Sequence, residues 1–207
     1  MTQADALPRR SNLPMTLTLS RIIAGPVIAG LVLWGETLVF DDRARAALLF
    51  ACAAALFIAA ALTDWLDGYL ARKLKAVTPL GAALDHCADK VLVTCALVAL
   101  AFHSLPLNLV VAAILLLGRD VTISGLREGL AASGRTLPVS WMGKWKAAAT
   151  MIGVAALLIE EAAFLYVAPD ALYIAAAWTG RIMIWAAVSL ALVSGWQYAA
   201  DAVRKTA

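Results

Sequence analysis

The sequence has few of the residues that a soluble protein places on its surface. Only 15% of its 207 residues are charged, whereas 63% are hydrophobic and the mean hydropathy is +0.84. A soluble globular domain is about half apolar and about a quarter charged, so this excess of apolar residues must face something other than a protein core. Apolar runs of the roughly 20 residues needed to cross a bilayer recur along the whole chain. They leave no segment for a separate soluble domain.

Sequence signals of several other protein classes are also missing. Residues 1–16 contain no apolar stretch of the kind found in signal peptides, so we expect no cleaved leader and instead a short cytoplasmic tail that can lie along the interface. The three cysteines form no Cys-x-x-Cys pair and read as small apolar residues in reduced surroundings. The chain has neither an internal repeat nor the paired broken segments of many transporters. Its formal charge of +3 is small, and we expect no nucleic-acid partner.

Hydropathy predicts an all-α integral membrane protein built as a bundle of six transmembrane helices. The first five expected spans are residues 17–40, 44–72, 81–102, 107–131 and 144–166. The sixth ends near Ala200, and its start is open because residues 171–180 read equally as span or as outer loop. The membrane domain is therefore expected to occupy residues 17–207.

Lysine and arginine gather in alternate loops, which predicts the orientation of the bundle. Basic residues precede the first span, follow the second, surround the link between the fourth and fifth, and end the chain. We therefore expect both termini, and a polar cavity, on the cytoplasmic side of the membrane. Arg181, near the start of the sixth span, is expected to reach the outer interface by snorkelling.

Four aspartates stand at the cytoplasmic ends of two consecutive spans. Asp64 and Asp67 close the second span, and Asp85 and Asp89 open the third. At about 100° per residue, each pair falls on one face of its helix, and antiparallel neighbours joined by a short loop can turn these faces toward each other. Single aspartates of this kind often cap helices or pair with nearby cations. Four of them at this spacing indicate a functional site, because ionisable residues within spans are costly.

Carboxylates this close repel each other unless a cation joins them. Ligands that are all oxygen select hard ions, so the sequence predicts Mg²⁺ or Mn²⁺ and not zinc. Gly68, Ala71 and Gly81 lack bulk and leave room for a ligand near the helix backbones, and Arg72 can bind a phosphate.

The motif Asp64-x2-Asp67-Gly68-x2-Ala71-Arg72-x8-Gly81-x3-Asp85-x3-Asp89 resembles the signature of the CDP-alcohol phosphatidyltransferase family at every specified position. That resemblance implies transfer of a phosphatidyl group from CDP-diacylglycerol to an alcohol, at a site with two metal ions. It implies that Asp64, Asp67 and Asp85 are the principal ligands and that Asp89 completes the site as general base. It further implies that Gly68, Arg72 and Gly81 contact the CDP group and that the protein is a homodimer.

Three more segments resemble the bacterial phosphatidylglycerophosphate synthases, a branch of this family. They are residues 12–21, 118–128 and 140–146, whereas the last third of the chain agrees only in hydropathy. This resemblance implies sn-glycerol 3-phosphate as the acceptor. Thr18 and Arg21, in the first segment, are expected to hold the cytidine or diphosphate, although Arg21 reads equally as an interface anchor. Asp120 stands where these synthases usually carry glutamate.

Basic residues near the fourth and fifth spans independently indicate an anionic acceptor. We expect Arg119, Arg127, Lys144 and Lys146 to bind its phosphate, although plain anchoring is an equal interpretation for Lys146. A buried Arg119 needs a partner, and Asp120 is expected to point to another side of the helix. The partner would then be a bound phosphate or the aspartates across the cavity.

Two other interpretations stay open. The acceptor could be another alcohol of the family, such as inositol phosphate, serine, choline or a lipid. An ion-coupled transporter could use the aspartates as a relay, but a relay needs polar groups through the full depth of the membrane. The aspartates instead gather at one end.

Overall fold

The computed structural model describes residues 13–74, 79–103, 105–132, 141–166 and 169–206, with side chains over 18–64, 84–102, 105–131, 141–166 and 169–198. Its six helices are α1 (Leu13–Leu38), α2 (Arg43–Leu74), α3 (Pro79–His103), α4 (Leu107–Ala132), α5 (Trp141–Tyr166) and α6 (Asp170–Thr206). No strand occurs in these ranges. The all-helical prediction is therefore confirmed. The open segment 171–180 belongs to α6, and α1 begins at Leu13, before the expected start of the first span.

Five of the helices contain segments that are long and apolar enough to cross a membrane. These segments are Thr18–Leu38, Arg43–Asp64, Leu107–Ala131, Trp141–Tyr166 and Asp170–Tyr198. Within the described residues, α3 is not among them, and its first half carries Asp85, Asp89 and Lys90. A protein with several membrane-type helices is thus confirmed, while the crossing of α3 stays a prediction.

Helix ends away from the aspartates are closed by side chains. Asp42 caps the start of α2, because the backbone N–H of Arg45 donates to its Oδ1 at 3.1 Å. Arg43 caps the C-terminal end of α5. Its Nε donates to the Leu165 carbonyl at 3.0 Å and its Nη2 donates to the Phe164 carbonyl at 2.9 Å. The start of α2 is thereby tied to the end of α5.

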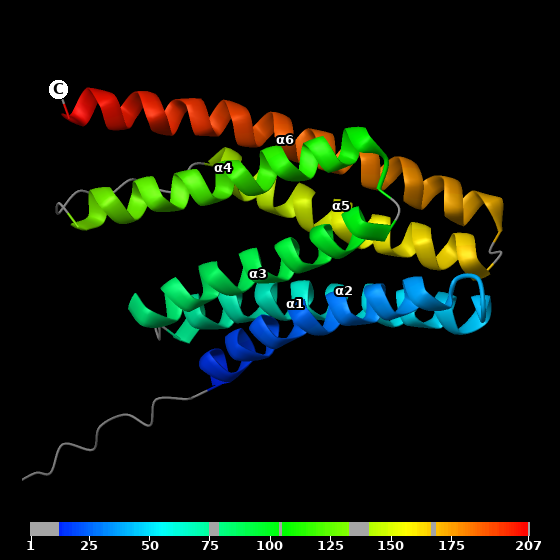
Figure 1. Cartoon of the computed structure of the whole chain (residues 1–207). Coiled ribbons are helices and arrows are strands. Elements are labelled where there is room, and N and C mark those ends of the chain that lie inside the picture. The colour runs from blue at the N-terminus through cyan, green and yellow to red at the C-terminus, as the bar shows by residue number, and fades with distance from the viewer. Residues whose placement is uncertain (1–12, 75–78, 104, 133–140, 167–168, 207) are drawn as a thin grey trace, which may run out of the picture.

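Successive helices run in opposite directions, with α1–α3 on one side of the molecule and α4–α6 on the other (Figure 1). The first helix packs against α2 and α3, α2 packs against α5, and α6 packs against both α4 and α5. As Figure 1 shows, α1 begins, α2 ends, α3 begins and α6 ends toward the same end of the bundle. The ends of α2 and α3 that carry the aspartates therefore meet there.

The contact between α1 and α3 depends on Gly25. A Cβ atom at this position would lie 3.1 Å from the carbonyl oxygen of Val91 and 3.3 Å from the Cα of Leu92. Small residues allow such close backbone approach between membrane helices. This contact holds α1 against the part of α3 that follows Asp89.

Candidate active site

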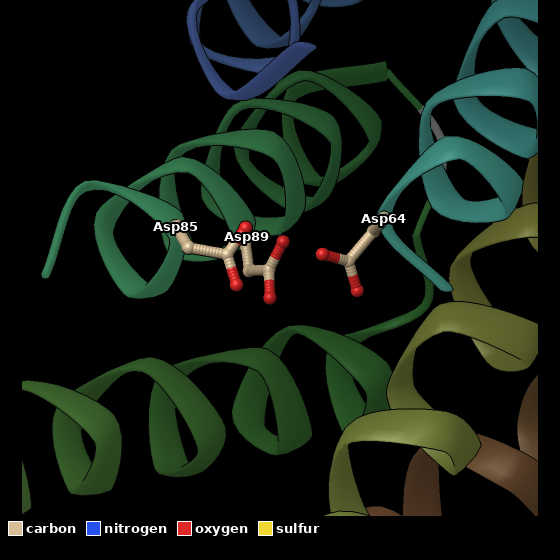
Figure 2. A group of neighbouring side chains, drawn as sticks. All are labelled: Asp64, Asp85 and Asp89. Atoms are coloured by element: carbon tan, nitrogen blue, oxygen red, sulfur yellow. The ribbon is translucent and has the colours of Figure 1, made fainter. Parts of the chain in front are cut away.

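Asp64, Asp85 and Asp89 come together at one end of the bundle. Asp64 lies on α2 and the other two lie one turn apart on α3, and Figure 2 shows the three side chains grouped with their carboxylates close together. One carboxylate oxygen from each lies within 4.8 Å of the others. Their side chains are 29%, 43% and 32% exposed, respectively, so a ligand can reach them. The predicted meeting of the two helix faces is observed for these three residues.

This donor set fits a hard divalent cation, because it offers three carboxylate oxygens and such ions prefer oxygen ligands. Asp67, the fourth expected ligand, lies further along α2, and Gly68 and Arg72 follow it in the same helix. Gly81 lies in the first turn of α3. The side chains of these positions fall outside the described residues.

Arg21 of α1 reaches all three carboxylates. Its Nη2 donates to Oδ1 of Asp85 at 2.6 Å, its Nη1 donates to Oδ1 of Asp89 at 2.8 Å, and Nη1 also pairs with Asp64. The Arg21 side chain is only 1% exposed, so its alternative interpretation as an interface anchor is wrong. Thr18, one turn earlier in α1, is also buried. A single guanidinium offsets one of three carboxylate charges, and the group keeps its attraction for further cations.

A second polar group joins α4 and α5. Lys146 Nζ donates to both carboxylate oxygens of Asp120, at 2.7 and 2.5 Å, and Arg119 Nη1 donates to Oδ1 of the same residue at 3.2 Å. The expectation that Asp120 points away from Arg119 is therefore wrong, because the long arginine side chain turns back to its neighbour. Lys146 is buried, so plain interface anchoring is also wrong for this residue.

Partners of Arg119 come from α6 as well. Its Nε donates to the Ala191 carbonyl at 3.1 Å and its Nη2 to the Ser194 hydroxyl at 2.8 Å. The guanidiniums of Arg119 and Arg127 lie 6.0 and 5.7 Å from the centre of the Tyr198 ring. Sequence reasoning missed Ser194 and Tyr198. Their spacing was a weak signal, since a serine and a tyrosine four residues apart share one face of a mostly apolar helix.

Lys90 joins α3 to the second polar group. It follows Asp89 in α3, and its Nζ donates to the Ser124 hydroxyl and, at 3.3 Å, to the backbone carbonyl of Asp120. Lys144, by contrast, is exposed and lies 5.3 Å from the ring of Trp141. Three of the four expected phosphate-binding cations thus gather beside α4 and α6, and Lys144 lies at the surface of α5.

Arg181 forms an ion pair between α5 and α6. Its Nη2 and Nη1 donate to the two carboxylate oxygens of Glu160 at 2.9 and 3.0 Å, and Nη1 also donates to the Ala177 carbonyl at 2.8 Å. The Arg181 side chain is still 34% exposed, so its reach to the outer interface stays a prediction beside this bidentate contact with a buried carboxylate.

Comparison with known proteins identifies the family of this chain. The sequence matches CDP-alcohol phosphatidyltransferase over residues 11–193. It is 39% identical over 193 residues to the CDP-diacylglycerol–glycerol-3-phosphate 3-phosphatidyltransferase of Bacillus subtilis (strain 168), covering 90% of this chain and 93% of that protein. A protein of the same name from Haemophilus influenzae is 43% identical over 136 residues, covering 64% of this chain and 71% of its own.

A third relative carries a different name. The cardiolipin synthase (CMP-forming) of Oryza sativa subsp. japonica is 35% identical over 166 residues, covering 74% of this chain and 47% of that protein. The family match contains the carboxylate group and its Arg21, as well as Asp120 and the cations around it. The chain belongs to the CDP-alcohol phosphatidyltransferase family.

Proposed function

We propose that this chain transfers the phosphatidyl group of CDP-diacylglycerol to sn-glycerol 3-phosphate. The products are phosphatidylglycerophosphate and CMP, and the reaction belongs to phospholipid biosynthesis. The observation that carries the reaction class is the convergence of Asp64, Asp85 and Asp89 from two helices. The names of the bacterial relatives support glycerol 3-phosphate as the acceptor.

The metal centre of the proposal uses Asp64, Asp67, Asp85 and Asp89 to hold Mg²⁺ or Mn²⁺, as two ions. When bound, the ions neutralise the diphosphate of the donor and stabilise the CMP leaving group. The carboxylates are partly exposed and carry excess negative charge, which supports this assignment.

Donor binding is assigned to residues on three helices. In the proposal, Gly68, Arg72 and Gly81 contact the CDP group, and Thr18 and Arg21 reach it from α1. The position of Arg21 beside the carboxylates supports this assignment, since the donor's diphosphate must bind next to any cation held there.

Proton transfer is assigned to Asp89, which accepts the proton of the acceptor hydroxyl. The hydroxyl oxygen attacks the β-phosphorus, which carries diacylglycerol, and the bond to the bridging oxygen breaks, so that this oxygen leaves with CMP. Arg119, Arg127, Lys144 and Lys146 bind the phosphate of the acceptor. Arginine suits this task because its planar guanidinium can make two parallel bonds to a phosphate.

The proposed setting is a bacterial inner membrane, crossed six times, with both termini and the polar cavity on the cytoplasmic side. Residues 1–16 form the tail, residues 17–207 form the membrane domain, and the protein is a homodimer. The arrangement in Figure 1 supports the orientation, because α1 begins and α6 ends toward the end of the bundle that holds the aspartates.

An acceptor assay tests the proposed function. Purified protein is given Mg²⁺, radiolabelled CDP-diacylglycerol and one acceptor at a time, and release of CMP is measured. We expect release with glycerol 3-phosphate and much less with inositol phosphate, serine or choline. A lipid acceptor is the second candidate, because one relative is named a cardiolipin synthase. CMP release with that lipid but not with glycerol 3-phosphate would refute the acceptor, and ion flux in vesicles without CMP release would favour a transporter.

Asp89→Asn tests the assignment of the base. We expect turnover to fall by at least about a hundredfold, because general acid–base catalysis contributes about 10²–10⁴-fold. Folding and most binding of the radiolabelled donor should persist, since three other aspartates remain. Asp170→Asn, at the other end of the bundle, is the matched control and should leave turnover unchanged. Wild-type turnover in Asp89→Asn would exclude this residue as the base.

A further inference from the structure

Asp120 bridges two of the cations assigned to the acceptor. Its Oδ1 accepts from Lys146 at 2.7 Å and from Arg119 at 3.2 Å, and its Oδ2 takes a second bond from Lys146 at 2.5 Å. Lys146 belongs to α5, whereas Arg119 and Asp120 belong to α4. One carboxylate therefore holds cations from two helices next to each other.

Lys146 and Arg119 both contact one carboxylate, and without it the two cations would repel each other. The side chains of Lys146, Arg119 and Asp120 are only 11%, 14% and 21% exposed, so solvent screens the repulsion weakly. The three residues together carry one net positive charge. The bridge thus keeps both cations in place and still leaves an attraction for an anion.

Other contacts fix this bridge against α3 and α6. The backbone carbonyl of Asp120 accepts from Lys90, the residue that follows Asp89. On the opposite side, Ser194 and the Ala191 carbonyl of α6 accept from Arg119. The position of Asp120 is therefore set by α3, and that of Arg119 by α6.

We propose that Asp120 is a positioning residue that assembles Lys146 and Arg119 into one receptor for the phosphate of the acceptor. This inference rests on the proposed function. A site whose cations are already held together binds its anion with a smaller loss of conformational freedom than one whose cations must be gathered first. Asp120 contacts the two cations and takes no part in the bond changes at phosphorus.

Steady-state kinetics of Asp120→Asn test this role. We expect the KM for glycerol 3-phosphate to rise about tenfold, in line with the loss of one charge-assisted interaction. Both kcat and the KM for CDP-diacylglycerol should stay within about twofold of wild type, because the variant loses only acceptor binding. Asp120→Glu restores the carboxylate and should bring the KM for glycerol 3-phosphate back to within about threefold of wild type.

Glu160→Gln is the matched control. It removes the other bidentate ion pair of α5, with Arg181 of α6, away from the acceptor cations. We expect it to lower the thermal stability without changing the KM for glycerol 3-phosphate. A residue that only ties helices together would behave in the same way, so the rise in KM separates positioning from a structural role.

A double variant covers the case in which Asp120→Asn does not fold. Asp120→Asn/Lys146→Gln leaves no unpaired lysine, and its KM for glycerol 3-phosphate should stay within about threefold of that of Lys146→Gln alone. If the fold-increase in KM of the double variant equals the product of the fold-increases of the two single variants, the inference is overturned. An unchanged or lowered KM in Asp120→Asn would also overturn it. If the wild-type protein releases no CMP with glycerol 3-phosphate, the proposed function fails and the inference fails with it.

Discussion

Arg21 joins three carboxylates that would otherwise repel one another. Its guanidinium comes from α1, whereas Asp64 lies on α2 and Asp85 and Asp89 lie on α3. The oxygens that bind Arg21 belong to the same three residues that are suited to a divalent cation. A metal ion that binds these oxygens must therefore compete with the arginine.

Arg21→Gln tests this competition. Without metal, we expect the variant to unfold about 3–6 °C below wild type, because carboxylates about one-third exposed lose a shared partner worth about 1–2 kcal/mol. Added Mg²⁺ should raise the unfolding temperature more in the variant than in wild type, since no resident cation opposes it. Arg21→Lys keeps the charge and serves as control. Equal stabilisation of all three proteins by Mg²⁺ would show that Arg21 and metal do not share these oxygens.

Single residues differ in how far the sequence predicts their positions. The grouping of Asp85 and Asp89 was predictable, because two residues four apart share a helix face. The burial of Arg21 among the carboxylates was not predictable, since it depends on how α1 packs against α3. The contact between Arg119 and Asp120 was predicted wrongly because helical spacing fixes the direction of a Cβ atom and not the path of a long side chain.

At the scale of the helix, close packing of α1 against α3 positions the cluster. Gly25 lies one turn after Arg21, and it contacts the residues of α3 that follow Asp89. The same turn of α1 thus supplies both the cation and the close contact. A shift of this helix would move Arg21 relative to its carboxylate partners.

Gly25→Ala and Gly30→Ala form a matched pair on α1. The new methyl group at position 25 would meet backbone atoms of α3 at 3.1–3.3 Å, so we expect a loss of about 1–3 kcal/mol and lower Mg²⁺-dependent turnover. No atom lies within 4 Å of a methyl group at position 30, and alanine there should stabilise the helix by up to about 1 kcal/mol. Thermal unfolding of the two variants measures the difference. Equal stability would contradict the role of Gly25 in helix packing.

The number and approximate positions of the helices were largely predictable from the sequence, whereas some helix ends were not. Long apolar runs defined five of the helices, because a helix in lipid must satisfy its backbone internally and present apolar side chains. In α3, the apolar run occupies only the second half of the helix. The start of α6 was ambiguous in hydropathy. The structure resolves it with Asp170 in the first turn and the Leu172 backbone N–H donating to the Pro169 carbonyl at 2.9 Å.

Across the whole molecule, the two polar groups belong to different parts of the chain. The carboxylates and Arg21 come from α1–α3, whereas Asp120, Arg119 and Lys146 come from α4 and α5 and are contacted by α6. Lys90 of α3 reaches across to α4. In the proposed reaction, the donor and the acceptor would therefore meet where these two sets of helices face each other.

Reporter fusions test the proposed orientation of the whole bundle. A green fluorescent protein fused after residue 207 should fluoresce, because we expect the C-terminus in the cytoplasm. An alkaline phosphatase fused at residue 40, between α1 and α2, should be active because that connection is expected outside. The exchanged fusions, with each reporter at the other position, are the controls and should be silent. Activity of the phosphatase fused after residue 207 would show that the orientation is opposite to the one proposed.

The pairing of Arg21 also matters while the protein is being made. Arg21, Asp64, Asp85 and Asp89 all precede α4 in the chain, so the ribosome delivers this cluster before α5 and α6 exist. An acidic cluster without a counter-charge would be costly near the lipid. Because Arg21 precedes the three aspartates in the chain, its guanidinium is synthesised before the carboxylates with which it pairs.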